Sequence, residues 1–252
     1  MIAKRRIITI SVVMVAVSLF AYSILFEKPE PRYAGKNLSE WLALYQWPER
    51  NGGVITEAEV AVREIGTNAL PFLCEWLRYE LPPWRRGLLR LATRPVEGKT
   101  LDEGKVVYGQ SLILGKSSRL SDLAELGFII LNTNAAAAIP ELETLMKDKN
   151  SDVAVRAIYA LGAIGGAAIP VLTNALADVK QANRCRIMEA IYGVEIDSHY
   201  YRNQASTGSS LPALTQSLND SDKEVRRQAK ITLYNLARHG IAPLAFAETT
   251  EK

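Results

Sequence analysis

Apolar residues recur along most of the chain at intervals of three and four, which places them on one face of an α-helix. From Val153 to Ile164 the apolar or small positions fall at i, i+4, i+7, i+8 and i+11, and the same spacing returns from Val54 to Ile65. Gly66 then ends the first helix, and Pro71 follows at the place of a second helix's first turn. The pattern predicts helical hairpins repeated about every 30 residues.

The stretch from Pro140 to Leu236 can be superposed on itself. A shift of 72 positions aligns it without a gap, and a shift of 30 superposes residues 140–161 on residues 170–191. Self-similarity at such a period predicts a solenoid, because a single hairpin cannot bury its apolar face alone. We therefore predict an all-α fold, an α-solenoid of about five stacked hairpins.

The positions that recur in the aligned segments form one pattern. Its members are Asp152, Val153, Ala157, Ala160, Leu161, Gly162, Ile164, Gly165, Ala168, Ile169, Pro170, Leu172 and Leu176. This pattern resembles the short HEAT repeat also found in phycobilin lyases, which implies a HEAT/armadillo-type superhelix. The run Gly66–Pro71, echoed at Thr133–Ala135, is similar to HEAT-repeat proteins of Verrucomicrobia-type bacteria. HEAT motifs specify a fold and do not specify a function.

Residues 1–26 have a composition of their own. Three basic residues, Lys4–Arg6, precede 20 residues without a charge, Ile7–Phe26. A helix of that length can cross the membrane, so we predict one N-terminal hydrophobic helix that acts as a signal anchor. The basic start predicts a single pass with the C-terminal domain outside the cytoplasm. A cleaved signal peptide, cut near Ala21–Ser23, is the alternative and would make the protein periplasmic or secreted.

The rest of the chain divides by composition. Residues 27–36 hold two prolines and alternating charge without an apolar period, and we predict a stiff linker. The solenoid is predicted over residues 37–252, with an irregular segment at 81–117 that does not fit the repeat. A polar insertion at 196–210 lengthens one proline-to-proline interval from 30 to 42 residues.

Charge and chemistry exclude several function classes. The formal net charge of +3 over 252 residues comes entirely from residues 1–26, so the remainder is neutral and we predict no nucleic-acid partner. His199 and His239 have no other ligand at metal-binding spacing, and no phosphate loop or nucleophile motif occurs. We predict no enzyme activity, no metal and no cofactor. Cys74 and Cys185 are too far apart in a solenoid to form a disulfide.

Two groups of residues are candidates for binding a partner. The first is a basic ridge in which arginines surround tryptophans, with a net charge of +4 over residues 78–94. Arginine and tryptophan dominate binding hot spots. Its members are Arg78, Trp84, Arg85, Arg86, Arg90 and Arg94. The second lies in the insertion and consists of Tyr200, Tyr201 and Arg202, because loops on a rigid scaffold often carry recognition. A solvated helix face and an inert loop are the respective alternatives.

These features predict a membrane-anchored, exported scaffold that presents a helical surface to another protein. One alternative is an enzyme, since the resemblance includes phycobilin lyases and alkyl-base DNA glycosylases, but both are hard to reconcile with export. Another is a binder of anionic lipid or an envelope polymer through the Arg78–Arg94 ridge. The identity of the partner and the oligomeric state do not follow from the sequence.

Overall fold

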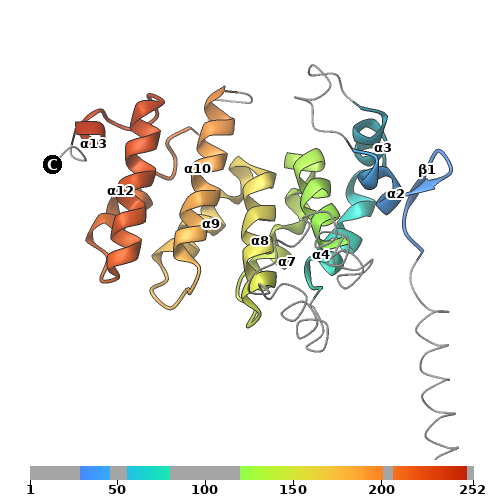
Figure 1. Cartoon of the computed structure of the whole chain (residues 1–252), viewed down its shortest axis with the longest axis horizontal. Helices are drawn as coiled ribbons and strands as arrows, with labels where there is room; N and C mark the ends of the chain where they lie inside the picture. Colours follow the sequence, from blue (N-terminus) through green and yellow to red (C-terminus); the bar gives the residue numbers. More distant parts are fainter. Residues whose placement is uncertain (1–28, 46–55, 80–119, 201–206, 249–252) are drawn as a thin grey trace, which may run out of the picture.

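The computed structural model describes residues 29–45, 56–79, 120–200 and 207–248. Helices dominate these residues and stand side by side in one row, from α2 (Leu38–Ala43) at one end to α13 (Ala245–Glu248) at the other (Figure 1). The predicted all-α solenoid is confirmed for this part of the chain.

Each repeat consists of a first helix, a tight turn and a second helix. The first helices are α3 (Glu57–Ile65), helix 120–131, α8 (Ser151–Ile164), α10 (Arg184–Tyr200) and α12 (Lys223–Arg238). The second helices are α4 (Leu70–Leu77), α7 (Ile139–Leu145), α9 (Ile169–Ala177), α11 (Leu211–Gln216) and α13. Short 3-10 helices are η2 (Gly66–Ala69), η3 (Asn132–Ala138), η4 (Gly166–Ala168) and η6 (Ser217–Asn219). Neighbouring first helices pack together, α8 on α10 and α10 on α12, and α9 packs on α10.

The turn inside a hairpin depends on one residue with a positive φ. Gly66 and Gly165 end α3 and α8 with φ of 59° and 88°. Asn132 takes this position after helix 120–131, with φ of 51°, because asparagine tolerates the left-handed region better than most residues. A proline then lies in the first turn of the second helix, as at Pro71 and Pro170, where its missing N–H leaves no hydrogen bond unmade.

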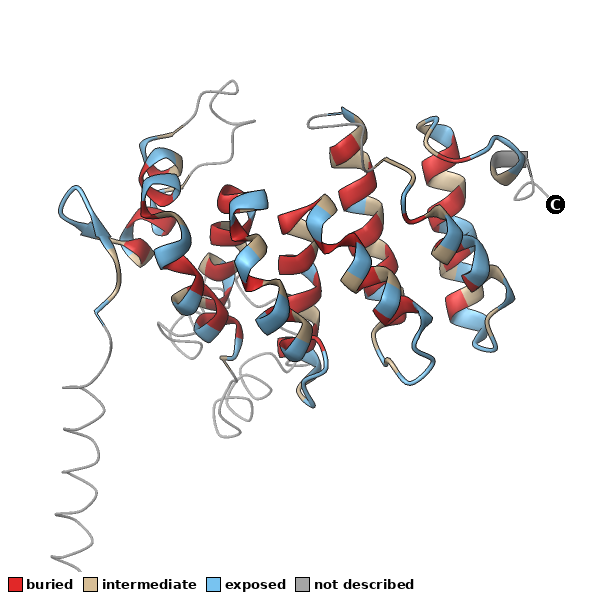
Figure 2. Ribbon diagram, turned by 180° about the vertical axis from the view of Figure 1, so that it is seen from behind, coloured by how far each residue is buried: buried red, intermediate tan, exposed pale blue. Residues whose placement is uncertain are grey.

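Small residues allow neighbouring helices to approach closely. A Cβ atom added to Gly127 would lie 2.5 Å from Cδ2 of the buried Leu73 on α4. A Cβ atom on Gly162 of α8 would lie 3.2 Å from the Cβ of Ala190 on α10. Figure 2 shows the result, with buried residues concentrated on the helix sides that face one another. The predicted core face of α8 is buried throughout, including Ala157.

The linker predicted at 27–36 differs from the structure where residues are described. Strands β1 (Arg32–Tyr33) and β2 (Lys36–Asn37) form an antiparallel hairpin whose two turn residues have φ of 45° and 84°. The carbonyl of Tyr33 accepts a 2.9 Å hydrogen bond from Nε1 of the buried Trp41. The segment therefore packs on the first helix and is no free spacer. Hydrogen bonds to α2 decided this, and an apolar pattern cannot reveal them.

The insertion predicted at 196–210 begins later than expected, because α10 continues as a helix to Tyr200. Ser198 is buried, one turn beyond the buried Val194, so the helical face persists through polar residues. The buried Glu195 accepts hydrogen bonds from the backbone N–H of Ser210 at 3.0 Å and from its hydroxyl at 2.6 Å. Glu195 thus holds the C-terminal end of the insertion against α10. The sequence analysis did not predict this contact.

The predicted N-terminal hydrophobic helix lies outside the described residues, so its prediction stands untested. Among the described residues, one helical stretch, Leu120–Leu145, is long and apolar enough to cross a membrane. Its left-handed Asn132 separates helix 120–131 from α7, and its apolar residues Phe128, Leu131 and Leu142 are buried in the core. This stretch is apolar because it forms a helical hairpin whose apolar side chains are buried in the core.

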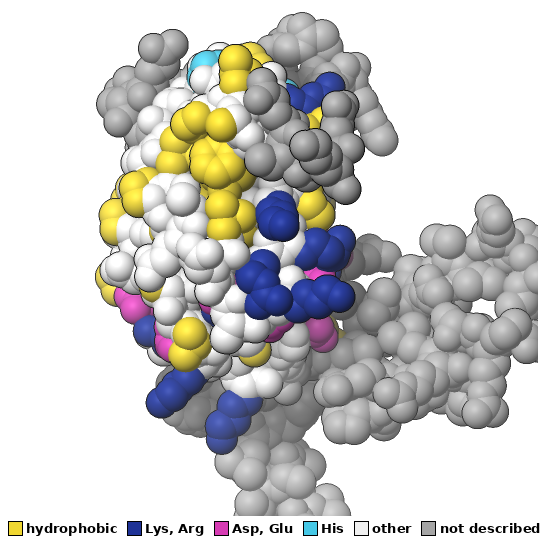
Figure 3. All heavy atoms as spheres, turned by 90° about the vertical axis from the view of Figure 1, so that its left-hand side faces the viewer, with side chains coloured by type: hydrophobic (Ala, Val, Ile, Leu, Met, Phe, Trp, Pro, Cys, Tyr) yellow, Lys and Arg dark blue, Asp and Glu magenta, His cyan; other side chains and the backbone are white. Residues whose placement is uncertain are grey.

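The C-terminal end of the row has a mixed surface. Figure 3 looks onto this end, where apolar side chains gather beside Lys and Arg. Leu244 and Ile231 are 70% and 37% exposed. At the position of α12 that aligns with Gly162 stands Tyr234, and the guanidinium of Arg238 lies 5.9 Å from its ring. A bulky aromatic where α8 has glycine prevents another first helix from packing as closely as α10 does.

Candidate functional site

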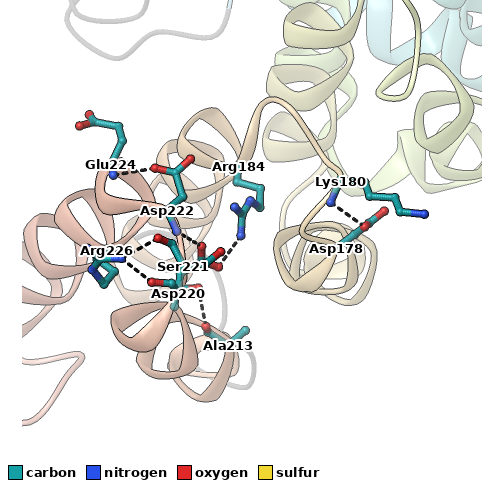
Figure 4. Close-up of polar contacts among 10 residues, drawn as sticks. Asp178, Lys180, Arg184, Ala213, Asp220, Ser221, Asp222, Glu224 and Arg226 are labelled. Carbon is teal, nitrogen blue, oxygen red and sulfur yellow. Dashed lines mark hydrogen bonds and ion pairs between the residues drawn. The ribbon is translucent and has the colours of Figure 1, made fainter.

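The aspartates that recur in the repeat shape the loops between hairpins. Asp148, Asp178 and Asp220 each accept, through Oδ1, a hydrogen bond from the backbone N–H two residues later, at 2.8, 3.0 and 2.8 Å. Figure 4 shows two of these turns, at Asp178 and Asp220. Asn150 and Asp222 then cap the next first helix. Each of these aspartates stabilises the turn in which it lies by accepting a hydrogen bond from the backbone of that turn. This explains why an aspartate recurs at the same place in the loops between repeats.

One loop is also fixed by a buried ion pair. The Arg184 guanidinium, at the start of α10, donates to Oδ2 of Asp220 before α12 (Figure 4), and their side chains are only 7% and 13% exposed. The N–H of Asp222 and the guanidinium of Arg184 hold the pKa of Asp220 below its ordinary value. Both carboxylate oxygens of Asp220 thus have donors, which indicates a structural role for this ion pair.

Arg156 on α8 holds a distant helix end. Its Nη1 donates to the carbonyl of Leu77 at 2.7 Å and its Nη2 to the carbonyl of Tyr79 at 2.9 Å. Its Nε donates to the carbonyl of Asp152 at 3.1 Å. The last carbonyl groups of a helix have no hydrogen-bond donor within that helix. At the end of α4, the guanidinium of Arg156, two repeats away, is the donor. Sequence reasoning missed it, because nothing local marks a donor 79 residues distant.

Beside Arg156 lies a groove of about 680 Å³ that spans several repeats. Helix 120–131, α8 and α10 follow one another along the row (Figure 1), and each contributes to the wall, together with Tyr79 after α4. The lining residues are Tyr79, Ser121, Asp122, Glu125, Ser151, Asp152, Val155, Arg156, Tyr159, Asn183 and Arg186. We call this set of residues the groove.

The groove contains polar groups without partners. Within the described residues, neither Asp122 nor Glu125 makes a hydrogen bond or an ion pair, and the Tyr79 hydroxyl is buried and unpaired. Burial raises the pKa of both carboxyls above their ordinary values, and the Asp122 charge raises that of Glu125 further. The nearby Arg156 lowers both pKa values only in part, since its N–H groups are directed at carbonyls.

The groove's two cations, in contrast, already have acceptors. Arg156 is occupied by three carbonyls, and Arg186 forms a 2.8 Å ion pair with Glu189. Tyr159, 37% exposed, donates its hydroxyl to Glu189 at 3.1 Å and leaves its ring at the surface. The groove lining therefore carries three carboxylates, Asp122, Glu125 and Asp152, against two guanidinium groups. The two carboxylates on helix 120–131 have no hydrogen-bonded cation among the described residues.

The predicted basic ridge is described only at its first member. Arg78 at the end of α4 forms a 2.9 Å ion pair with Glu141 on α7, and both side chains are about half exposed. This contact joins two hairpins, so Arg78 already has an acidic partner. Trp84, Arg85, Arg86, Arg90 and Arg94 lie outside the described residues.

Of the second predicted group, only Tyr200 is described. It ends α10, is 53% exposed, and places its hydroxyl 2.9 Å from Nδ1 of His239 after α12. Tyr192 reaches the other ring nitrogen of His239 at 3.4 Å. Tyr201 and Arg202 lie outside the described part of the chain. His239 thus links two repeats, and Tyr200 is engaged in this contact.

The cysteines and the candidate ligands suggest no reaction centre among the described residues. Cys74 is buried, Cys185 is half-buried, and both are free, as predicted. Burial raises the pKa of Cys74 to about 12, which disfavours the reactive thiolate. No group of three or more His, Cys, Asp or Glu in the described ranges could hold a metal ion. The absence of a metal, a cofactor and an enzyme activity stays a prediction.

Two segments of the chain match family models of helical repeats. Residues 153–178, which cover most of α8, η4 and α9, match the PBS lyase HEAT-like repeat. Residues 211–240, which cover α11, η6 and α12, match the HEAT repeat. No curated protein matches the chain significantly. The similarity to Verrucomicrobia-type proteins stays a prediction. The chain contains HEAT-type repeats, which suggest a helical scaffold for protein interaction.

Proposed function

We propose that this protein is a non-catalytic scaffold that binds another protein in the groove on its first helices. One observation carries the proposal: side chains of successive repeats converge on a groove of about 680 Å³ that retains unpaired polar groups. Buried polar groups normally have partners, so the unpaired Tyr79 hydroxyl and the half-buried, unpaired Glu125 support the assignment of the groove as a binding surface. Solenoids present such surfaces because their repeats stack in a line.

The proposal includes the location of the scaffold. Residues 1–26 would hold it in the cytoplasmic membrane with the solenoid outside, or direct its export if they are cleaved. The basic, then uncharged composition of this segment supports both forms. Labelling of the full chain in intact cells with a membrane-impermeant reagent distinguishes an exterior solenoid from a cytoplasmic one.

The alternatives have weaker support. Binding of anionic lipid or polymer would use the Arg78–Arg94 ridge, and Arg78 is already paired with Glu141. An enzyme would need a reactive centre in the groove, and the groove lining holds no histidine, cysteine or lysine that could activate a nucleophile, nor a metal-binding cluster among the described residues. Protein binding remains the function that the groove supports best.

A photo-crosslinking experiment tests the proposal. A photoreactive phenylalanine at Tyr159, on the groove wall, should cross-link a partner protein in intact membranes. The matched control at Asn174, an exposed residue of α9 outside the groove, should not. Equal adducts at both positions, or none at Tyr159, would contradict the proposal.

A further inference from the structure

The unsatisfied groups of the groove define what the partner must supply. Asp122 and Glu125 accept hydrogen bonds only, when ionised, and neither has a partner among the described residues. A donor with positive charge would satisfy both. Desolvation by the groove makes their charged forms costly until such a donor arrives.

An anionic ligand does not fit this arrangement. The two cations of the groove are engaged, Arg156 with three carbonyls and Arg186 with Glu189. Arg186 bonds Glu189 through Nη1 alone, but a phosphate or carboxylate would also lie beside Asp122, Glu125 and Asp152, and these three carboxylates outnumber the two guanidinium groups of the lining. Charge complementarity therefore selects a cation.

A metal ion fits poorly too, because no group of three carboxylate, histidine or cysteine ligands occurs among the described residues. The groove is instead extended across repeats, with the partly exposed ring of Tyr159 on one wall. An aromatic face beside carboxylates suits a lysine or arginine side chain, which gains from both. A polypeptide carries such side chains at the spacing that a long groove can use.

We infer that the groove recognises a basic segment of the partner polypeptide, with one lysine or arginine seated between Asp122 and Glu125. This inference rests on the proposed function and specifies the partner's chemistry. Glu125 is half-buried and Asp122 is exposed, so an ion pair with Glu125 forms in a medium less polar than water, whereas one with Asp122 stays solvated. Binding weakens as salt increases, because part of the site stays solvated.

Fluorescence anisotropy with the full-length protein in detergent tests the inference. The probe is a labelled short peptide of alternating lysine and alanine, with glutamate–alanine and glutamine–alanine peptides as comparisons. The lysine peptide should bind at least tenfold more tightly than the other two. The double variant Asp122→Asn/Glu125→Gln should lower its affinity at least about tenfold, which corresponds to 1.4 kcal/mol.

The matched control is Glu64→Gln, which removes an exposed carboxylate of α3 outside the groove and should leave the affinity unchanged. Circular dichroism verifies that each variant is folded. Equal affinity for the three peptides, or an unchanged affinity of the double variant, would overturn the inference.

Two further results separate the inference from the function on which it depends. If the cross-link at Tyr159 forms and survives in the double variant, the groove binds a protein but not through a basic residue, and the inference fails alone. If Arg85, Arg86, Arg90 and Arg94 are replaced by serine and the peptide then binds more tightly, the basic segment of the chain itself competes for the groove. That outcome would also overturn recognition of a partner.

Discussion

Two acidic regions of this molecule differ in how their charge is satisfied. In the loop before α12, Asp220 accepts bonds from the N–H of Asp222 and from Arg184, and its pKa is lowered. In the groove, Asp122 and Glu125 have no partner among the described residues, and their pKa values are raised. In the loop, the carboxylate stabilises the fold through hydrogen bonds within the chain. In the groove, the carboxylates make no such bonds among the described residues and can accept them from a partner. This difference in hydrogen bonding, and not the number of carboxylates, distinguishes the proposed binding groove from the structural loop.

The largest expected effect is at Arg156, which lies in the groove but is fully engaged. Arg156→Ala removes three hydrogen bonds to backbone carbonyls, so the free energy of unfolding should fall by about 3 kcal/mol. Urea unfolding followed by circular dichroism measures it. Arg63→Ala, which breaks an exposed pair with Glu59, is the control and should have a much smaller effect. A similar loss in both variants would refute the structural role of Arg156.

The second largest effect on stability is expected at the ion pair between Arg184 and Asp220. Arg184→Ala leaves Asp220 buried without its cation and should lower the free energy of unfolding by about 2 kcal/mol. Because its folded pKa is lowered, the charged Asp220 stabilises the fold above its unfolded pKa of about 3.9, and this stability is lost as the pH falls through the folded value. Unfolding curves across this range should be less acid-sensitive in the variant. Identical pH profiles would show that Arg184 does not hold Asp220.

A smaller effect is expected at the equivalent aspartate of an earlier loop. Asp148→Ala removes the hydrogen bond from the N–H of Asn150 and should cost about 1 kcal/mol, because no arginine pairs with this aspartate among the described residues. Asp148→Asn retains an acceptor oxygen and should recover most of the loss. A full loss in the asparagine variant would mean that the charge, and not the turn, matters here.

The smallest effect has the opposite sign. Glu125→Gln should raise the free energy of unfolding at neutral pH by less than about 1 kcal/mol, since it removes an unpaired charge that water partly screens. Because the folded pKa is raised, this gain should be present above it and should vanish as the pH falls toward the unfolded value of about 4.3. Thermal unfolding at several pH values tests this. A destabilised variant would show that Glu125 has a structural partner and would remove the contrast between the two regions.

The fold could be predicted from the sequence because its determinants are local and repeated. The spacing from Val153 to Ile164, the glycine that ends the helix and the proline that follows it fix each hairpin. Stacking then follows from the unburied apolar face. Two details of the prediction were wrong, because polar residues were taken as evidence against regular structure. Residues 32–37 form a β-hairpin, and residues 196–200 belong to helix α10.

The candidate site could not be predicted, and the physical reason is distance along the chain. Glu125 and Arg156 look like ordinary surface residues of amphipathic helices, and Tyr79 looks like the last residue of one. The sequence by itself determined the helices, their ends and their order in the row. Only the tertiary structure decided which polar groups find partners, because a carbonyl of Leu77 and a guanidinium of Arg156 meet only after the repeats have stacked.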